Sequence, residues 1–483
     1  MRRRLWWIAL IASALLFTHS LLVAHYLGQR YVSDEVWYVD AARNILSSVF
    51  HSSPRDAPGA NILVPDCKPP TRALAECNCS RDAVWLREDC AVWVPRHCAE
   101  CVARALNSSV VVWGWVEGRA RDLLRYWNLE HPPLAKYVIV FSMWVGGDRF
   151  WSWRLPEIVA GSITVYLVYE MCLAALGGLF GELVGVSAAF LTAASRVFEA
   201  MSAIAMLDVY VALFSVAAAV ALFRRRPWLA IALIAVGFCF KFSVLLAAIP
   251  CAIYIARMGL RRVGLRALEA LYFVPLAAFI AGVAVDCLVS APIWLRIGFV
   301  KWFGESVAGA IKWHLSTKCY GSSCPPASTP IQWFLDQNPF PLYITKPYSL
   351  YAAPYAPLWI FALASCILFT ALAFEKCVGL EPWSWLTGLL IGWYLIYAAG
   401  NHSLYSFYAA QLAPFVAFWV AWLALETARS RGRVWIEAVK VWAEAPRSVR
   451  EAVKELKKRV ESVLGKHLGG DTVPNSRDDH EER

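Results

Sequence analysis

The sequence predicts an all-α polytopic membrane protein. Of its 483 residues, 59% are hydrophobic and only 17% are charged, so the chain is more apolar than an ordinary soluble domain. Apolar runs long enough to cross a bilayer as helices recur through most of its length. Basic residues form short clusters between these runs, as they do in cytoplasmic loops. The formal charge of +10 therefore does not indicate nucleic-acid binding.

The first apolar run predicts a transmembrane helix within residues 1–27. Met1-Arg2-Arg3-Arg4 resembles the start of a signal peptide, but the run from Leu5 to Leu27 is too long for a typical signal-peptide core. We therefore expect an uncleaved helix with its N-terminus inside. Asp34 and Glu35 follow closely and are expected to end this helix at the outer face. Charges there are costly unless they are paired or used, although a simple polar helix end is the plain alternative.

Residues 28–153 are expected to form an external loop that ends in an interfacial helix near 134–145. The part before about residue 130 is too charged to lie in the membrane. An even number of cysteines outside the cell suggests disulfides with fifteen pairings open, and the six are Cys67, Cys77, Cys79, Cys90, Cys98 and Cys101. A zinc site built on Cys77-x-Cys79 and His97-Cys98-x-x-Cys101 is the alternative, but its spacing is irregular. Asn78-Cys79-Ser80 and Asn107-Ser108-Ser109 are glycosylation patterns that agree with an outside location.

The remaining chain is expected to cross the membrane repeatedly, for a total of about ten spans with both termini inside. Transmembrane helices are predicted within 154–289 and 353–428, and a second external loop, with Cys319 and Cys324 as a disulfide candidate, is predicted at 290–352. The predicted spans lie near 155–176, 179–194, 203–223, 228–256 (two short helices broken at Lys241), 267–289, 355–374, 383–399 and 405–425. Basic clusters then fall on one side.

A basic amphipathic tail is predicted for residues 429–483, on the cytoplasmic side. Apolar residues recur there at helical spacing, at Val449, Val453, Leu456, Val460 and Val463. Such a helix would lie on anionic lipid. A solvated or dimerising helix is the alternative.

Charged residues of both signs collect at the predicted outer face. They are Asp34, Glu35, His131, Lys136, Arg154, Arg196, Asp208 and Lys241. Cations beside a carboxylate suggest a site for an anionic group together with a proton acceptor. A lipid phosphate fits, because Arg and Lys pair phosphate while the lipid tail runs between helices. The carboxylate can then deprotonate an incoming hydroxyl.

These residues also carry a family resemblance over about residues 30–245. The ordered motifs are Asp34-Glu35, His131-Pro132-Pro133-Leu134-Ala135-Lys136, Arg154-Leu155-Pro156, Ser195-Arg196 with Leu207-Asp208, and Gly237 with Lys241. The set resembles the protein O-mannosyltransferase type, which are dolichyl-phosphate-mannose-dependent glycosyltransferases of the GT-C fold. That family's Tyr-His-Tyr pattern near the last helices is replaced here by Tyr405-Ser406-Phe407-Tyr408, with His402 nearby.

The resemblance implies transfer of a sugar, mannose first, from a polyprenyl or dolichyl phosphate to a hydroxyl on the external (luminal) face, with inversion. It implies Asp34 as general base, with Glu35 sharing that role or holding a cation. It assigns the donor phosphate to Arg154, with His131, Lys136, Arg196 and Lys241 around it. Second-tier candidates are Asp208, His402 and Tyr405. Without the resemblance, each charge reads as a membrane anchor or a structural pair.

The acceptor, the sugar and the oligomeric state are not named by the sequence. Protein Ser/Thr and a lipid-linked glycan both fit as acceptor. The motifs contain no metal site and require no cofactor, although they leave a divalent metal open. A secondary transporter is an alternative class, but repeated halves and charges at the membrane midplane are missing from the sequence pattern. A non-catalytic scaffold would leave the outer charges unexplained.

Overall fold

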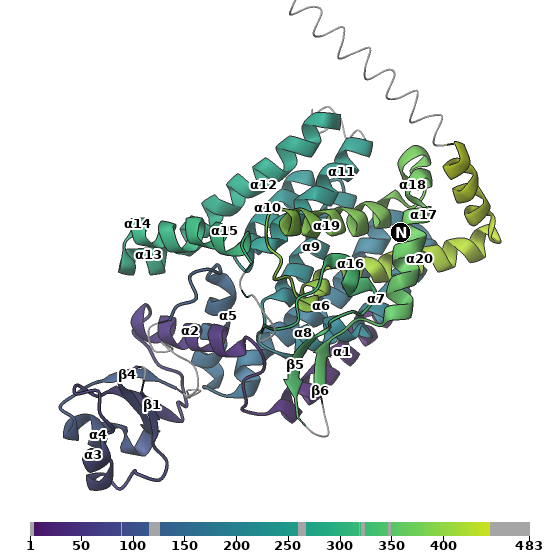
Figure 1. Ribbon diagram of the computed structural model, residues 1–483. Coiled ribbons are helices and arrows are strands. Elements are labelled where there is room, and N and C mark those ends of the chain that lie inside the picture. The colour runs from purple at the N-terminus through teal and green to yellow at the C-terminus, as the bar shows by residue number, and fades with distance from the viewer. Residues whose placement is uncertain are drawn as a thin grey trace, which may run out of the picture.

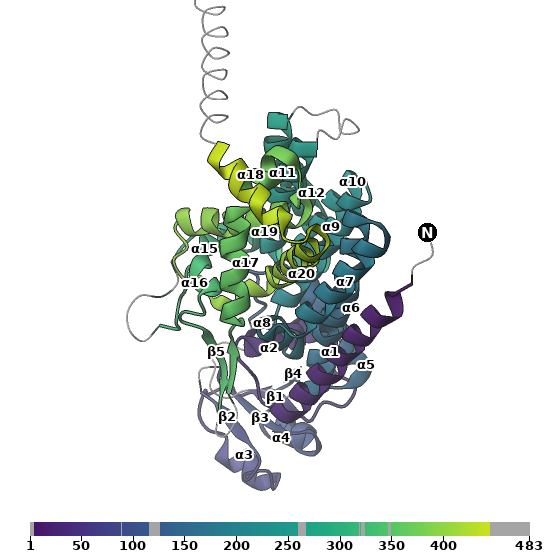
Figure 2. The same cartoon turned by 90° about the vertical axis from the view of Figure 1, so that its right-hand side faces the viewer.

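The protein is a helical body that carries a small disulfide-bonded module at one end (Figures 1 and 2). The computed structural model describes residues 4–87, 89–114, 126–258, 267–317, 319, 324–345 and 349–444. Helices dominate these residues, which confirms the predicted mostly helical class. The predicted amphipathic tail from Val449 to Val463 lies outside the described residues.

Three helices of the described residues are long and apolar enough to cross a membrane: α1 (Trp6–Leu27), α6 (Phe150–Leu176) and α12 (Ala267–Val289). Two bent pairs raise the number to five if each counts as one span. They are α7 (Gly178–Ala193) with α8 (Arg196–Ala203), bent by 64°, and α17 (Ala356–Leu368) with α18 (Thr370–Lys376), bent by 48°. The expected total of about ten spans stays a prediction.

Shorter helices complete the body. They are α9 (Asp208–Phe223), α10 (Pro227–Phe238), η2 (Phe242–Ala247), α11 (Ala248–Met258), α19 (Leu380–Ala398), η5 (Ser406–Gln411) and α20 (Ala413–Ser430). The predicted break at Lys241 is present, because this residue is extended between α10 and η2. Gly237 allows the two neighbouring helices to meet, since a Cβ there would lie 2.5 Å from Cβ of Phe214 on α9.

The prediction that Asp34 and Glu35 end the first helix is wrong. α1 stops at Leu27, where Gly28 adopts a φ of +63°. The chain then turns through Ser33, with a φ of +53°, and Asp34 stands at the N-cap of a new helix, α2 (Glu35–Ser48). Sequence reasoning took α2 for loop because polar residues interrupt its apolar pattern. The carboxylates therefore begin a helix that packs against α5 (Leu134–Gly146), the predicted interfacial helix.

Residues 57–114, here called the disulfide module, form an antiparallel sheet in the order β2-β3-β1-β4. Its elements are β1 (Gly59–Leu63), α3 (Thr71–Glu76), β2 (Val84–Leu86), β3 (Ala91–Pro95), η1 (Arg96–Cys98), α4 (Ala99–Ala105) and β4 (Val110–Trp113). The cysteines pair as Cys67–Cys90, Cys77–Cys101 and Cys79–Cys98. The predicted disulfides are thus confirmed. The zinc alternative is wrong, because its cysteines are in disulfides and have no thiolate to bind a metal.

The 290–352 region is also folded. It contains α13 (Ala291–Ile297), α14 (Phe299–Trp302), a π-helical turn η4 (Phe303–Ala308), α15 (Gly309–His314), α16 (Pro330–Phe334) and a hairpin of β5 (Phe340–Ile344) with β6 (Ser349–Ala352). Cys319 and Cys324 are joined, as expected. The hairpin and the disulfide module lie toward the same end of the molecule, opposite α11 and α18 (Figures 1 and 2).

Candidate functional site

A cavity of about 550 Å³, here called the central cavity, opens beside the start of α2. Its size is within the range of small-molecule sites. It brings together segments far apart in the chain, and its wall includes Asp34, Tyr38, His131, Lys241, His314, Tyr405 and Tyr408. Four predicted site residues therefore meet here.

Asp34 is one of two carboxylates that line this cavity, and Glu130 is the other. Removal from bulk water raises its pKa to about 6, while the charge of Lys241 opposes the rise and that of Asp208 adds to it. A carboxyl group with this pKa is mostly ionised at neutral pH and yet accepts a proton readily. This is the balance that a general base needs.

Lys241 is the cation of the cavity. Its Nζ donates to both carboxylate oxygens of Asp208 at 2.8 Å and lies 4.7 Å from the ring centroid of Tyr408. The pair is buried, because the two side chains are 5% and 3% exposed. An ammonium has three donors, so one remains for an anion in the cavity.

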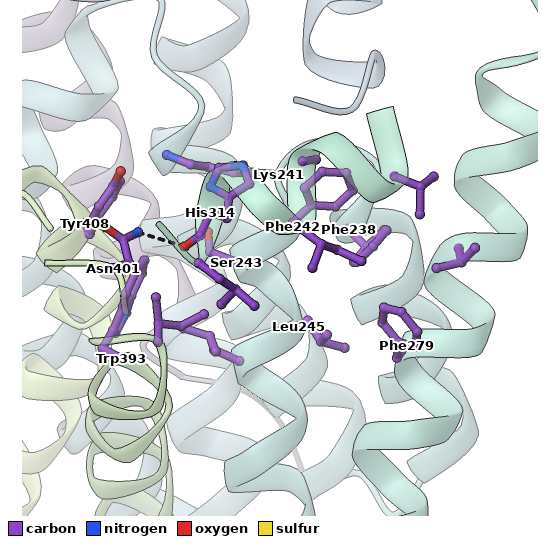
Figure 3. A pocket seen from close by; sticks show the side chains of 17 residues that line it. Phe238, Lys241, Phe242, Ser243, Leu245, Phe279, His314, Trp393, Asn401 and Tyr408 are labelled. Atoms are coloured by element: carbon purple, nitrogen blue, oxygen red, sulfur yellow. Dashed lines mark hydrogen bonds between the residues drawn. The ribbon is translucent and has the colours of Figure 1, made fainter. Parts of the chain in front are cut away.

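An apolar groove meets the central cavity at Lys241 (Figure 3). The two spaces share Lys241, His314 and Tyr408. Apart from these three residues, most of the groove lining is hydrophobic and includes Phe238, Phe242, Leu245, Phe279 and Trp393. A ligand with a charged head and a hydrocarbon tail would match this change from polar to apolar walls.

Arg154 does not lie in the cavity wall. Its Nε and Nη2 donate to the two oxygens of Glu35, each at 2.7 Å, and both side chains are fully buried. Nη1 donates to the carbonyls of Ala24 and Gly28, and Nη2 donates also to that of Arg30. The five donors of a guanidinium are thereby occupied. In this arrangement Arg154 holds the chain between α1 and α2, and its assignment to the donor phosphate stays a prediction.

Glu35 completes this arrangement, here called the Glu35–Arg154 clasp. Its Oε2 accepts from the Val32 backbone N–H at 2.8 Å and its Oε1 from that of Ala205 at 2.7 Å. The carboxylate therefore joins the 28–35 turn to the segment between α8 and α9. Glu35 points away from the space that its neighbour Asp34 lines.

The His131–Lys136 motif is divided between two tasks. His131 lies in the cavity wall, with its ring centroid 5.6 Å from Tyr38 and 5.1 Å from His314. Lys136 is buried and donates to backbone carbonyls, that of His131 at 2.8 Å and that of Asn128. Burial lowers the pKa of Lys136 to about 7. Lys136 shapes the 128–131 loop and does not line the cavity.

Two further predicted residues lie outside the cavity lining. Arg196 is exposed at the start of α8, and His402 is exposed and packs against the ring of Tyr397. Tyr405, by contrast, is in the wall. Sequence reasoning missed Tyr38, His314 and Tyr408. Tyr38 stands four residues after Asp34, so recognition of α2 would have placed both on one helix face; no motif marks His314.

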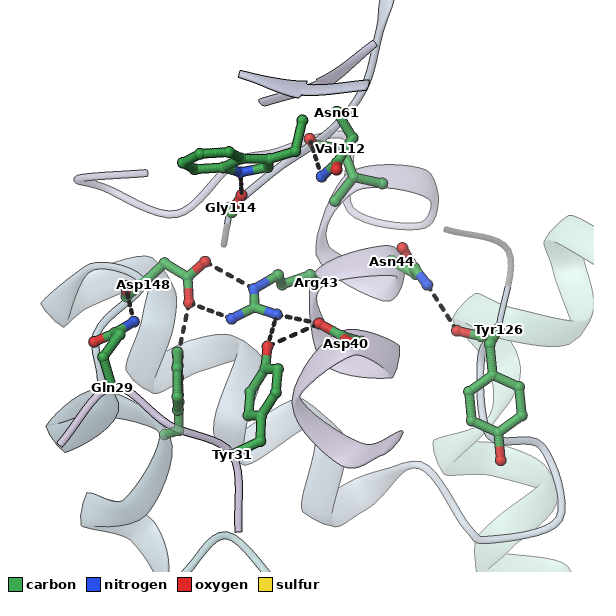
Figure 4. A network of polar contacts seen from close by, with 12 residues as sticks. Gln29, Tyr31, Asp40, Arg43, Asn44, Asn61, Val112, Gly114, Tyr126 and Asp148 are labelled. Carbon is green, nitrogen blue, oxygen red and sulfur yellow. Dashed lines mark hydrogen bonds and ion pairs between the residues drawn. The ribbon is translucent and has the colours of Figure 1, made fainter. Parts of the chain in front are cut away.

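A second buried network fixes α2 from the other side (Figure 4). Arg43 donates from Nε and Nη2 to Asp148 at 2.7 and 2.8 Å, and its Nη1 contacts Asp40 and the Tyr31 hydroxyl. Burial raises the pKa of Asp40 to about 7. Gly114, at the end of β4, lies so close that a Cβ would stand 2.5 Å from Oδ2 of Asp148. The network therefore joins α2 to the disulfide module.

Metal ligation has little support among the described residues. The group with suitable ligand geometry is Cys79, His97 and Cys98 in the disulfide module. Cys79 and Cys98 are joined to each other, so their sulfurs are not thiolates. None of these three residues lines the central cavity.

These features define a helical membrane-type protein with a charged cavity beside an apolar groove. Part of the chain matches a known family: the sequence model of the dolichyl-phosphate-mannose-protein mannosyltransferases matches residues 130–285. The resemblance predicted from the motifs is thereby confirmed over this region, which holds His131, Arg154, Arg196, Asp208 and Lys241.

Among solved structures, the chain is similar to ArnT from Cupriavidus metallidurans, whose crystal structure is bound to undecaprenyl phosphate. The TM-score is 0.46 at 15% identity, and the match covers 90% of this chain. The chain spans 63% of the length of that protein. No curated protein matches the sequence.

Proposed function

We propose that this protein is a membrane glycosyltransferase of the GT-C type that uses a polyprenyl-phosphate or dolichyl-phosphate sugar. Mannose is the first candidate sugar, and a hydroxyl of protein Ser/Thr or of a lipid-linked glycan is the acceptor. The observation that carries the proposal is the junction at Lys241, where an ionised carboxylate, a buried cation and an apolar groove meet. The family match over residues 130–285 supports the donor class.

In the proposed reaction, the lipid tail lies in the apolar groove and the phosphate contacts Lys241 at the junction. Asp34 takes the proton of the acceptor hydroxyl as its oxygen bonds to the anomeric carbon of the sugar. The bond from that carbon to the phosphate oxygen breaks, and the phosphate leaves with the electron pair. Attack opposite the leaving group inverts the anomeric centre. Lys241 stabilises the charge that develops on the phosphate.

We place the active site on the external face of the membrane. The disulfide module supports this side, because disulfides persist in oxidising compartments. The cavity lies at the end of the molecule that bears the module. Cysteine labelling of intact cells with an impermeant reagent, after reduction, tests the side: Cys98 should react and a cysteine introduced at Arg225 should not.

The direct test is to incubate purified protein with radiolabelled polyprenyl-phosphate mannose. Release of labelled sugar from the lipid, as transfer product or as free mannose, is the expected result. Lys241→Met paired with Asp208→Leu removes both charges without leaving a buried ion alone, and should abolish donor binding. Asp208→Asn, which keeps the cation, is the matched control and should retain binding. A donor that stays intact with the unaltered protein would contradict the proposal.

A further inference from the structure

A third space, here called the side groove, leads away from the central cavity. The two spaces share Tyr126, Asn128, Glu130 and Trp313. The side groove shares no lining residue with the apolar groove at Lys241. The central cavity therefore has two separate extensions, one apolar and one of mixed character.

The far wall of the side groove comes from the second folded external region. It is formed by α13, α14, η4 and α15, which contribute Ile297, Lys301, Gly304, Glu305 and Gly309. Lys301 and Glu305 are exposed there. They carry opposite charges and lie about one helical turn apart. η4 is a π-helical turn, and such turns are frequent at functional sites.

The near wall is ordered before any ligand arrives. The Tyr126 hydroxyl donates to Oε1 of Glu130, and Asn128 Nδ2 lies 2.7 Å from that hydroxyl and 3.1 Å from the same carboxylate oxygen. Asn128 is in turn held by Lys136, which donates to its backbone carbonyl. The polar groups that face the groove are therefore fixed in position, which lowers the entropy lost on binding.

We propose that the side groove binds the carbohydrate part of a glycan acceptor and directs its terminal hydroxyl toward Asp34. Trp127 and Trp313 offer flat faces to sugar rings, and the carboxylates of Glu130 and Glu305, with the Asn128 amide, offer partners for hydroxyl pairs. One common way to bind an extended peptide is to add it to a strand edge. The side-groove lining that the structure describes comes from helices and the 126–130 loop, with no strand.

The inference rests on the proposed transfer reaction, so the experiment separates the two. Purified protein is given radiolabelled polyprenyl-phosphate mannose with either octyl oligomannosides or a short Ser/Thr peptide. Labelled octyl glycoside as the main product is expected. Label on the peptide, or labelled donor that is hydrolysed without any transfer, would overturn the glycan acceptor while leaving donor use intact. A donor that is not consumed at all would instead reject the reaction itself.

Variants of the groove give the second readout. Glu305→Gln and Trp313→Ala should each raise the KM for the octyl glycoside about tenfold, as expected for one lost contact of ordinary strength. Glu305 lines the side groove and not the central cavity, so Glu305→Gln should leave the KM for donor unchanged. Trp144→Ala is the matched control, because Trp144 is a similarly exposed indole on α5 outside the groove. Equal effects of Trp313→Ala and Trp144→Ala, or unchanged acceptor KM in both groove variants, would remove the side groove from acceptor binding.

Discussion

Asp34 and Glu35 are neighbours in sequence, yet they belong to two opposite kinds of environment. Asp34 lines a cavity and faces a cation across open space. Glu35 is fully buried in the Glu35–Arg154 clasp, where its oxygens take four hydrogen bonds. A carboxylate whose hydrogen-bond partners are all supplied by the protein is not available to a ligand. The comparison teaches that a carboxylate in this region is open to a ligand only where it lines a cavity and its oxygens are not all hydrogen-bonded by the protein.

The sharpest test of this contrast is Asp34→Asn. The change keeps the shape of the side chain and removes the proton acceptor, so sugar transfer should fall by about two to four orders of magnitude. Donor binding and thermal stability should stay close to those of the unaltered protein. Initial rates with labelled donor, together with a thermal melt in detergent, provide the measurements. A fully active Asp34→Asn protein would break the assignment.

Arg154→Ala should show the reverse profile. It leaves Glu35 buried without its cation, which typically destabilises a protein by about 3–5 kcal/mol. We therefore expect loss of folded protein in a thermal melt before any specific effect on donor affinity. Arg154→Lys should rescue little, because an ammonium cannot make the bidentate pair together with three carbonyl contacts. Normal stability with a selective loss of donor affinity would instead return Arg154 to the phosphate site.

The pH dependence of the reaction should report the ionisation of Asp34. The base acts only when ionised, and its pKa of about 6 means that the ionised fraction falls as the pH drops below that value. The kcat/KM for sugar transfer should then decrease about tenfold for each pH unit below 6. A profile that stays flat down to pH 4.5 would show that a different group takes the proton.

The smallest effects are expected at charged residues that the motifs suggested and the cavity excludes. Arg196→Ala and His402→Ala alter exposed side chains, so stability should change by less than about 0.5 kcal/mol. Transfer rates should stay within about twofold. Steady-state rates for both variants check this. A large loss in either one would mean that the central cavity extends beyond its present walls.

The sequence predicted the helical class, the disulfides and a helix near 134–145 because each has a local signal. Apolar runs, paired cysteines and the Pro132-Pro133 start of α5 are visible within short windows. It also named Asp34, His131, Lys241 and Tyr405, which the structure brings into one cavity. The sequence did not predict α2. One buried face of this helix carries the polar residues Asp40 and Arg43, so the helix lacks a clear apolar periodicity.

The roles of Arg154 and Lys136 were not readable from the sequence. Both are cations near the expected outer face, and both donate to backbone carbonyls. Arg154 meets the carbonyls of Ala24, Gly28 and Arg30, more than 120 residues away, and such backbone partners leave no trace in residue identity. His314 was missed for a similar reason, since only the fold of the 290–352 region brings it beside His131.

The position of α2 has a consequence for where the protein can work. Val36 and Trp37 of this helix pack against the sheet of the disulfide module, while Asp34 at its start lines the cavity. Native disulfides in small modules commonly contribute about 2–5 kcal/mol each. A newly made chain with reduced cysteines would present α2 against an unformed sheet, and its carboxylate would lack a fixed position. Sugar transfer would then require oxidative folding of the disulfide module, so that copies retained in a reducing compartment stay inactive.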